Sequence, residues 1–111
     1  MPTLTATQPP VNLPTTRAEA AARIAVKYPH LSHVAARALA IADTDKVRPL
    51  SLTRVYVVSE QGKQEYQLTA GTNGWQCTCP AWYYNPVYIN GRRYCKHIMA
   101  MAIYYTQENT Q

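Results

Sequence analysis

The feature that most constrains the fold of this chain is a set of four potential metal ligands in two close pairs, Cys77 with Cys79 and Cys95 with His97. Residues two apart on a strand point to the same side, so the first pair can present two thiolates to one ion. Two residues are about 200° apart around a regular helix, so Cys95 and His97 can converge only where a helix begins. The sequence therefore predicts a site where a strand ends and a helix starts.

Three Cys and one His complete a tetrahedral shell, the ligand set of structural zinc, whereas a catalytic zinc keeps one position open for water or substrate. We therefore predict one Zn²⁺ per chain, bound by Cys77, Cys79, Cys95 and His97. One alternative is an iron–sulfur cluster, although the denser ligand runs usual for clusters are missing. The other alternative is unrelated buried cysteines and a surface histidine, against which the two tight pairs argue.

The bulk composition fits a small intracellular protein that needs a metal for stability. The chain has 111 residues and no Phe, so its core is small, and its three cysteines, an odd number, argue against a disulfide framework. Its formal net charge of +5 favours acidic partners such as nucleic acid. No stretch approaches the roughly 20 apolar residues of a membrane span, and the N-terminus lacks a signal-peptide pattern. We expect a soluble, cytoplasmic protein that does not bind membranes.

The chain divides into a tail and one predicted domain. Residues 1–14 hold four of the eight prolines and are expected to form a flexible tail. Residues 15–111 are expected to form a single domain, with a helical hairpin at 15–46 and the zinc-binding part at 50–105.

Two Ala-rich helices are predicted in the hairpin. The first begins at Thr16, which forms a capping-box pattern with Glu19, and ends before Pro29. The second begins near Ser32 and carries a helical apolar face made of Val34, Ala35, Ala38, Leu39 and Ala42. His30 and His33 lie near the turn between them, and we interpret both as solvent-exposed because a second metal site would need more ligands.

Strand patterns follow the hairpin. Residues 54–59 (RVYVVS), 64–69 (QEYQLT) and 75–79 predict an antiparallel meander, because turn residues separate segments of period two. Residues 95–105 lack Gly and Pro and predict a closing helix. The expected fold class is small α+β: a helical hairpin, then a meander and a closing helix around one zinc.

The stretch CTCPAWYYNPVYINGRRYCKHIMAMAIYY resembles a SWIM zinc finger, whose pattern is C-x-C, a variable linker and C-x-H. Pro80 after the second Cys, Lys96 between the last two ligands and an apolar helix after His97 add to the match. The Arg-Ala pattern of residues 36–42, followed by a strand pair, is similar to small bacterial SWIM-containing proteins. The resemblance implies a β-β-α zinc fold that binds DNA or protein.

Most aromatic residues of the chain lie between Trp75 and Tyr105, and many of them lie in the linker between the ligand pairs. We expect Trp82, Tyr94 and Tyr104 to pack in the core. The other rings of the linker are predicted to stack on nucleic-acid bases beside a basic edge. These rings are Tyr83, Tyr84 and Tyr88.

The turn pair Asn90-Gly91 predicts a hairpin over residues 86–94 that presents Arg92 and Arg93 at its exit. Adjacent residues of a strand face opposite ways, so only one of these arginines is expected to be available for phosphate. Lys96 is a third candidate phosphate contact.

Two functions follow from this surface. The first is a module that binds nucleic acid, with DNA as the expected partner, through the basic and aromatic loop. The second is a protein-interaction adaptor, because Tyr, Trp and Arg are also enriched at interface hot spots. We expect no enzymatic activity, because the acidic residues are few and scattered and the cysteine pairs are assigned to metal.

Overall fold

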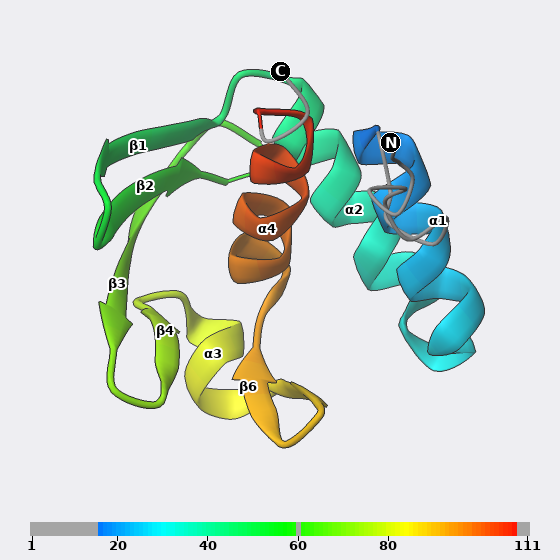
Figure 1. The fold of residues 1–111 in the computed structure, drawn as a ribbon. Helices are drawn as coiled ribbons and strands as arrows, with labels where there is room; N and C mark the ends of the chain where they lie inside the picture. Colours follow the sequence, from blue (N-terminus) through cyan, green and yellow to red (C-terminus); the bar gives the residue numbers. More distant parts are fainter. Residues whose placement is uncertain (1–15, 60, 109–111) are drawn as a thin grey trace, which may run out of the picture.

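A computed structural model describes residues 16–59 and 61–108 of the chain. The predicted flexible tail, residues 1–14, lies outside these ranges. The described part is a small α+β fold in which a helical hairpin precedes an antiparallel sheet and a closing helix, as the sequence predicts (Figure 1). None of its helices is both long enough and apolar enough to cross a membrane.

The hairpin consists of α1 (Arg17–Lys27) and α2 (Ser32–Asp43), joined by the short 3₁₀ helix η2 (Pro29–Leu31). Thr16 caps α1 as predicted, because its hydroxyl accepts a hydrogen bond of 3.0 Å from the backbone N–H of Glu19. The small alanine side chains on the facing surfaces let the helices approach closely. Ala35, Ala38 and Ala42 of α2 are accordingly buried in the core.

The main sheet has four antiparallel strands in the order of the sequence, one more than the sequence pattern predicts. They are β1 (Val47–Ser51), β2 (Arg54–Val58), β3 (Glu65–Gly71) and β4 (Gly74–Cys77). The additional strand is β1, which contains Pro49 and has a register irregularity between Pro49 and Ser51. Since β1 lies at the edge of the sheet, the missing N–H of proline is tolerated there, although it obscures the strand in the sequence.

The segment between the two ligand pairs, expected to be a variable loop with one hairpin, also contains a helix. This is α3 (Pro80–Tyr84), which begins with proline at its first position. The predicted hairpin follows as β5 (Val87–Ile89) and β6 (Arg92–Tyr94). Asn90 and Gly91 have φ values of 53° and 78°, the left-handed conformation that a two-residue hairpin turn requires.

The closing helix α4 (Lys96–Glu108) lies between the sheet and the helical hairpin (Figure 1). One face of the sheet supplies Val55, Val57 and Leu68 to the core, all at 0% exposure. Met99 and Ile103 of α4 are buried in the same core cluster as the alanines of α2. Helix α4 is therefore the element against which both the four-stranded sheet and the helical hairpin pack.

Arg17 ties the start of α1 to the far end of α4. Its side chain donates hydrogen bonds of 3.1 Å to the carbonyl oxygens of Tyr104 and Ala42, in α4 and α2 respectively. Its guanidinium also lies 4.3 Å from the centroid of the Tyr104 ring. The ion pair with Asp43 is looser, at 3.7 Å, and the carboxylate is half exposed. The charge-assisted bonds to the carbonyls are therefore the stronger part of this contact.

Replacing Arg17 with Met should lower the free energy of unfolding by about 1.5–3 kcal/mol, because two carbonyls lose a charged donor and Tyr104 loses its cation–π partner. Urea unfolding followed by circular dichroism measures the change. Asp43→Asn is the control and should change stability by less than about 1 kcal/mol, since an exposed ion pair contributes little. Equal losses of unfolding free energy in the two variants would show that the ion pair with Asp43, and not the bonds to the carbonyls, provides the stabilisation.

Candidate metal centre

The first ligand pair lies where the sheet ends. Leu68 of β3 pairs with Cys77, the last residue of β4, and both side chains face the core. Thr78 is exposed and its hydroxyl accepts a hydrogen bond of 3.1 Å from the backbone N–H of Gln67. Cys79 is buried again and has extended backbone as the N-cap of α3. The alternation predicted for a strand thus continues to Cys79, although strand pairing ends at Cys77.

The second ligand pair lies where α4 begins, as predicted. Cys95 directly precedes the helix, and its carbonyl accepts the N–H of Met99 at 3.0 Å. His97 lies in the first turn. This non-helical start is what lets two residues with one residue between them face the same point.

The structure brings the four predicted ligands together in a closed, buried cluster. The ligand atoms of Cys77, Cys79, Cys95 and His97 all lie within 4.8 Å of one another, and none of the four residues is more than 3% exposed. A tetrahedral zinc with Zn–S bonds of about 2.3 Å would place ligand atoms about 3.8 Å apart. The cysteines form no disulfide. The cluster is thus placed to bind one metal ion, and its donor set fits one zinc.

The protonation of the three thiols indicates why a cation is needed here. Hydrogen bonds from Cys77 and then Cys95 lower the pKa of Cys79 well below its usual range. Hydrogen bonds to Cys79 and Cys95, followed by burial, raise the pKa of Cys77 far above its usual range. The three thiols are therefore coupled, and their burial and mutual hydrogen bonds oppose having all three charged at once. A divalent cation would stabilise all three thiolates together and displace their protons.

His97 supports the same assignment. Its Nδ1 lies 3.9 Å from the Cys95 Sγ, whereas its Nε2 is buried and has no hydrogen-bond partner in the described part of the chain. Burying a ring nitrogen without a partner is costly, and a bond from Nε2 to a metal would offset that cost. The Tyr66 ring packs against the imidazole with 4.7 Å between centroids. Sequence reasoning did not single out Tyr66, although period two in β3 places it on the same face as Leu68.

The rings predicted to bind a partner lie at the surface. Tyr83 and Tyr84 of α3 are 59% and 86% exposed, and Tyr88 of β5 is 60% exposed. In contrast, Trp82 is buried, while Tyr94 and Tyr104 are half-buried and pack against the core, as the sequence analysis expects.

The two adjacent arginines differ in their surroundings, as strand alternation predicts. Arg92 is exposed. Arg93 is half-buried, and its guanidinium lies 4.8 Å from the centroid of the Trp82 ring. The Nε of Arg93 is buried and unpartnered within residues 16–59 and 61–108. Lys96 is half-buried at the first position of α4.

The remaining histidines lie apart from the cluster. His30 in η2 and His33 in α2 are both exposed, and His30 makes an edge contact with the Tyr28 ring. Neither belongs to the group of metal-ligating side chains found among the described residues.

Comparison with models of protein families matches residues 54–105 to the family described as SWIM zinc finger. The match runs from β2 to α4 and includes all four ligands. No curated protein and no solved structure matches the chain.

Metal analysis of the purified chain should give about one zinc per molecule, and His97→Ala should weaken zinc binding by more than about 100-fold. Because metal binding and folding are coupled, the variant should also lose the ordered environment of the buried Trp82. Competition with a chromogenic chelator and near-UV circular dichroism measure the two effects.

His33→Ala, which removes an exposed histidine, is the matched control and should keep both the zinc and the spectrum. A stoichiometry near zero or near two in the wild-type chain would contradict the single closed site. Native zinc affinity in His97→Ala would remove this residue from the ligand set.

Proposed function

Since residues 54–105 form a SWIM zinc finger, we propose that the chain is a zinc-stabilised module that binds nucleic acid, with DNA as its partner. The metal has a structural role in this proposal, because four protein ligands leave no position for substrate. The module is a binding protein and not an enzyme. A cytoplasmic location suits it, because thiols remain reduced and available to zinc there.

The observation that carries the proposal is the exposure of three tyrosine rings on the finger. Tyr83, Tyr84 and Tyr88 expose more than half of their surface, although aromatic side chains are usually buried where the fold allows it. Contact between Arg93 of β6 and Trp82 of α3 holds the elements that carry these rings together. Exposed rings of this kind stack on bases without requiring a particular sequence.

The charge of the finger supports the same partner. Residues 54–105 contain five basic and two acidic residues, so this segment contributes to the positive excess of the chain. Arg92 is exposed beside the aromatic elements and is the arginine best placed for phosphate. Arg93 is better suited to holding the surface in shape, because its guanidinium packs on Trp82.

A protein-interaction adaptor is the second candidate, and a separate observation favours it. Leu50 and Leu52, near the turn between β1 and β2, are 60% and 94% exposed. Large exposed aliphatic side chains contribute to protein interfaces and have no counterpart on a phosphate backbone. The same tyrosines would then serve as anchors for a partner protein.

Arg92→Ala should weaken binding to a short single-stranded DNA for all sequences alike and reduce the salt dependence, because a phosphate contact carries charge but no base information. Tyr84→Ala should cost about 1–3 kcal/mol of binding free energy and leave the salt dependence unchanged. Fluorescence anisotropy with a labelled oligonucleotide over a series of salt concentrations separates the two effects.

Arg37→Ala removes the same charge from the exposed surface of α2 and is the control; it should bind as the wild type does. A larger loss for Arg37→Ala than for Arg92→Ala would move the binding surface to the helical hairpin. If no oligonucleotide binds at low salt, the adaptor function is favoured.

A further inference from the structure

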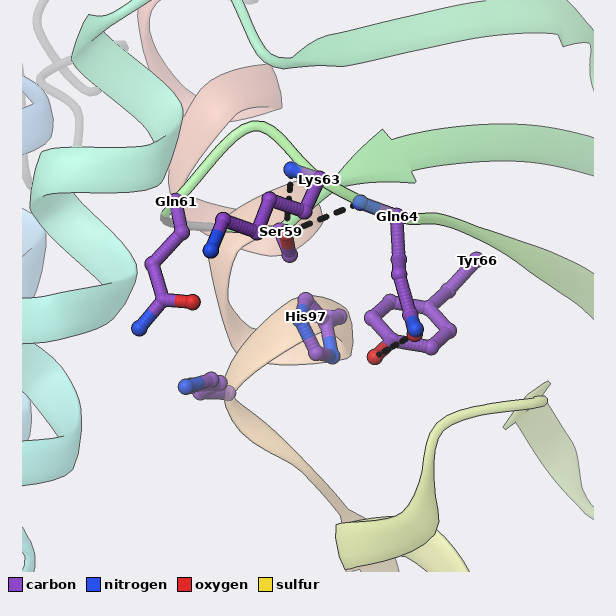
Figure 2. Close-up of a pocket in the computed structure, with 7 residues that line it drawn as sticks. Ser59, Gln61, Lys63, Gln64, Tyr66 and His97 are labelled. Atoms are coloured by element: carbon purple, nitrogen blue, oxygen red, sulfur yellow. Dashed lines mark hydrogen bonds between the residues drawn. The ribbon is translucent and has the colours of Figure 1, made fainter.

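A hollow of about 320 Å³ lies beside the metal centre, between the connection from β2 to β3 and the start of α4 (Figure 2). In Figure 2, Gln61 and Lys63 extend on one side of His97, with Gln64 and Tyr66 on the other. We call this hollow the lysine pocket. The residues that line it are Ser59, Gln61, Lys63, Gln64, Tyr66, Lys96 and His97.

Hydrogen bonds to Ser59 fix the outer wall of the lysine pocket. The Ser59 backbone N–H donates to the Gln64 carbonyl at 2.7 Å, and its hydroxyl oxygen accepts the N–H groups of Lys63 and Gln64 at 3.3 Å. A hydroxyl that accepts two bonds still has its own proton to donate. Ser59 therefore shapes the loop and offers a donor to the pocket.

The Gln64 side chain, like the Ser59 hydroxyl, is left with a hydrogen-bond donor. The Tyr66 hydroxyl donates to the Gln64 Oε1 at 2.8 Å, which occupies the acceptor end of the amide and leaves the Nε2 group as the donor. Tyr66 is itself fixed by its packing against His97. The orientation of this donor is thus linked to a ligand of the metal centre.

The charged side chains that line the lysine pocket are cationic among the residues that the structure describes. Lys63 and Lys96 both line it, and the lining residues that the structure describes include no carboxylate. Glu65 pairs with Val58 on the sheet face opposite to the core-facing residues of β3, so alternation directs its side chain away. The Lys63 ammonium, an amide N–H and a hydroxyl proton are complementary to an anion with several acceptor oxygens.

We propose that the lysine pocket binds a phosphate group. The pocket is larger than a phosphate ion, so it has room for the molecule to which the phosphate is attached. The group can be a free or terminal phosphate, or a phosphodiester of a nucleic-acid backbone. This assignment does not rest on the aromatic surface of α3 and β5, so it can hold where the proposed function fails.

The test uses the zinc-loaded full chain and three probes: inorganic phosphate, an oligothymidylate with a 5′-phosphate, and the same oligomer with a 5′-hydroxyl. Saturable shifts of the backbone amide signals of Lys63 and Gln64 in NMR titrations report binding. Lys63→Gln should weaken binding by about tenfold, because one charged donor is lost. Lys27→Gln, the same change on the exposed surface of α1, should have no effect.

Gln64→Glu is the sharper variant, since a carboxylate of the same shape still accepts from Tyr66 but replaces the donor with a negative charge. It should abolish phosphate binding while zinc stoichiometry and melting temperature stay near those of the wild type. Binding of all three probes would identify a backbone phosphodiester as a ligand. Binding restricted to inorganic phosphate and the 5′-phosphorylated oligomer would identify a terminal phosphate.

Absence of a saturable shift with every probe would overturn the proposal, as would unchanged phosphate binding in folded Gln64→Glu. The proposed function fails separately, because Arg92 and Tyr84 lie outside the lysine pocket. Oligonucleotide binding that depends on Arg92 and Tyr84 but not on Lys63 would leave the proposed function in place and exclude a backbone phosphodiester as the ligand of the lysine pocket.

Discussion

The junction between the end of β4 and the start of α4 is the constraint on which the rest of the structure depends. Two thiolates from one side and a thiolate with an imidazole from the other must share a buried volume. Three buried thiolates repel one another, so a divalent cation is what makes the junction favourable. The sheet and the helical hairpin pack on opposite sides of α4, and both therefore rely on how this helix is held (Figure 1).

Local rules predicted the metal centre well because each ligand pair obeys one geometric requirement. Strand alternation brings Cys77 and Cys79 to one side, and a helix start does the same for Cys95 and His97. The strand β1 was missed because Pro49 interrupts its pattern, and α3 because its five residues are too short to show a period and include aromatic residues of modest helix propensity. The Arg93 contact with Trp82 joins two such segments, and no local pattern predicts it.

The basic residues of the chain divide into different roles, which its net charge does not reveal. Arg17 and Arg93 each place a guanidinium over an aromatic ring, so both hold elements together. Arg92 is exposed, and Lys63 lines a pocket with Lys96. The formal value of +5 therefore does not tell which cations a partner can contact, and the two proposals share cations of residues 54–105, Arg92 in one and Lys63 in the other.

The position of α4 in the sequence also determines when the fold can form during synthesis. Arg17 and the Tyr104 carbonyl to which it donates are 87 residues apart, and Cys77 and Cys79 likewise wait for ligands that α4 brings. A nascent chain that has released α1, α2 and the four-stranded sheet thus has neither its metal shell nor the surface that joins its two layers. The metal shell and the surface that joins the sheet to the hairpin can consequently be completed only after α4 has emerged from the ribosome.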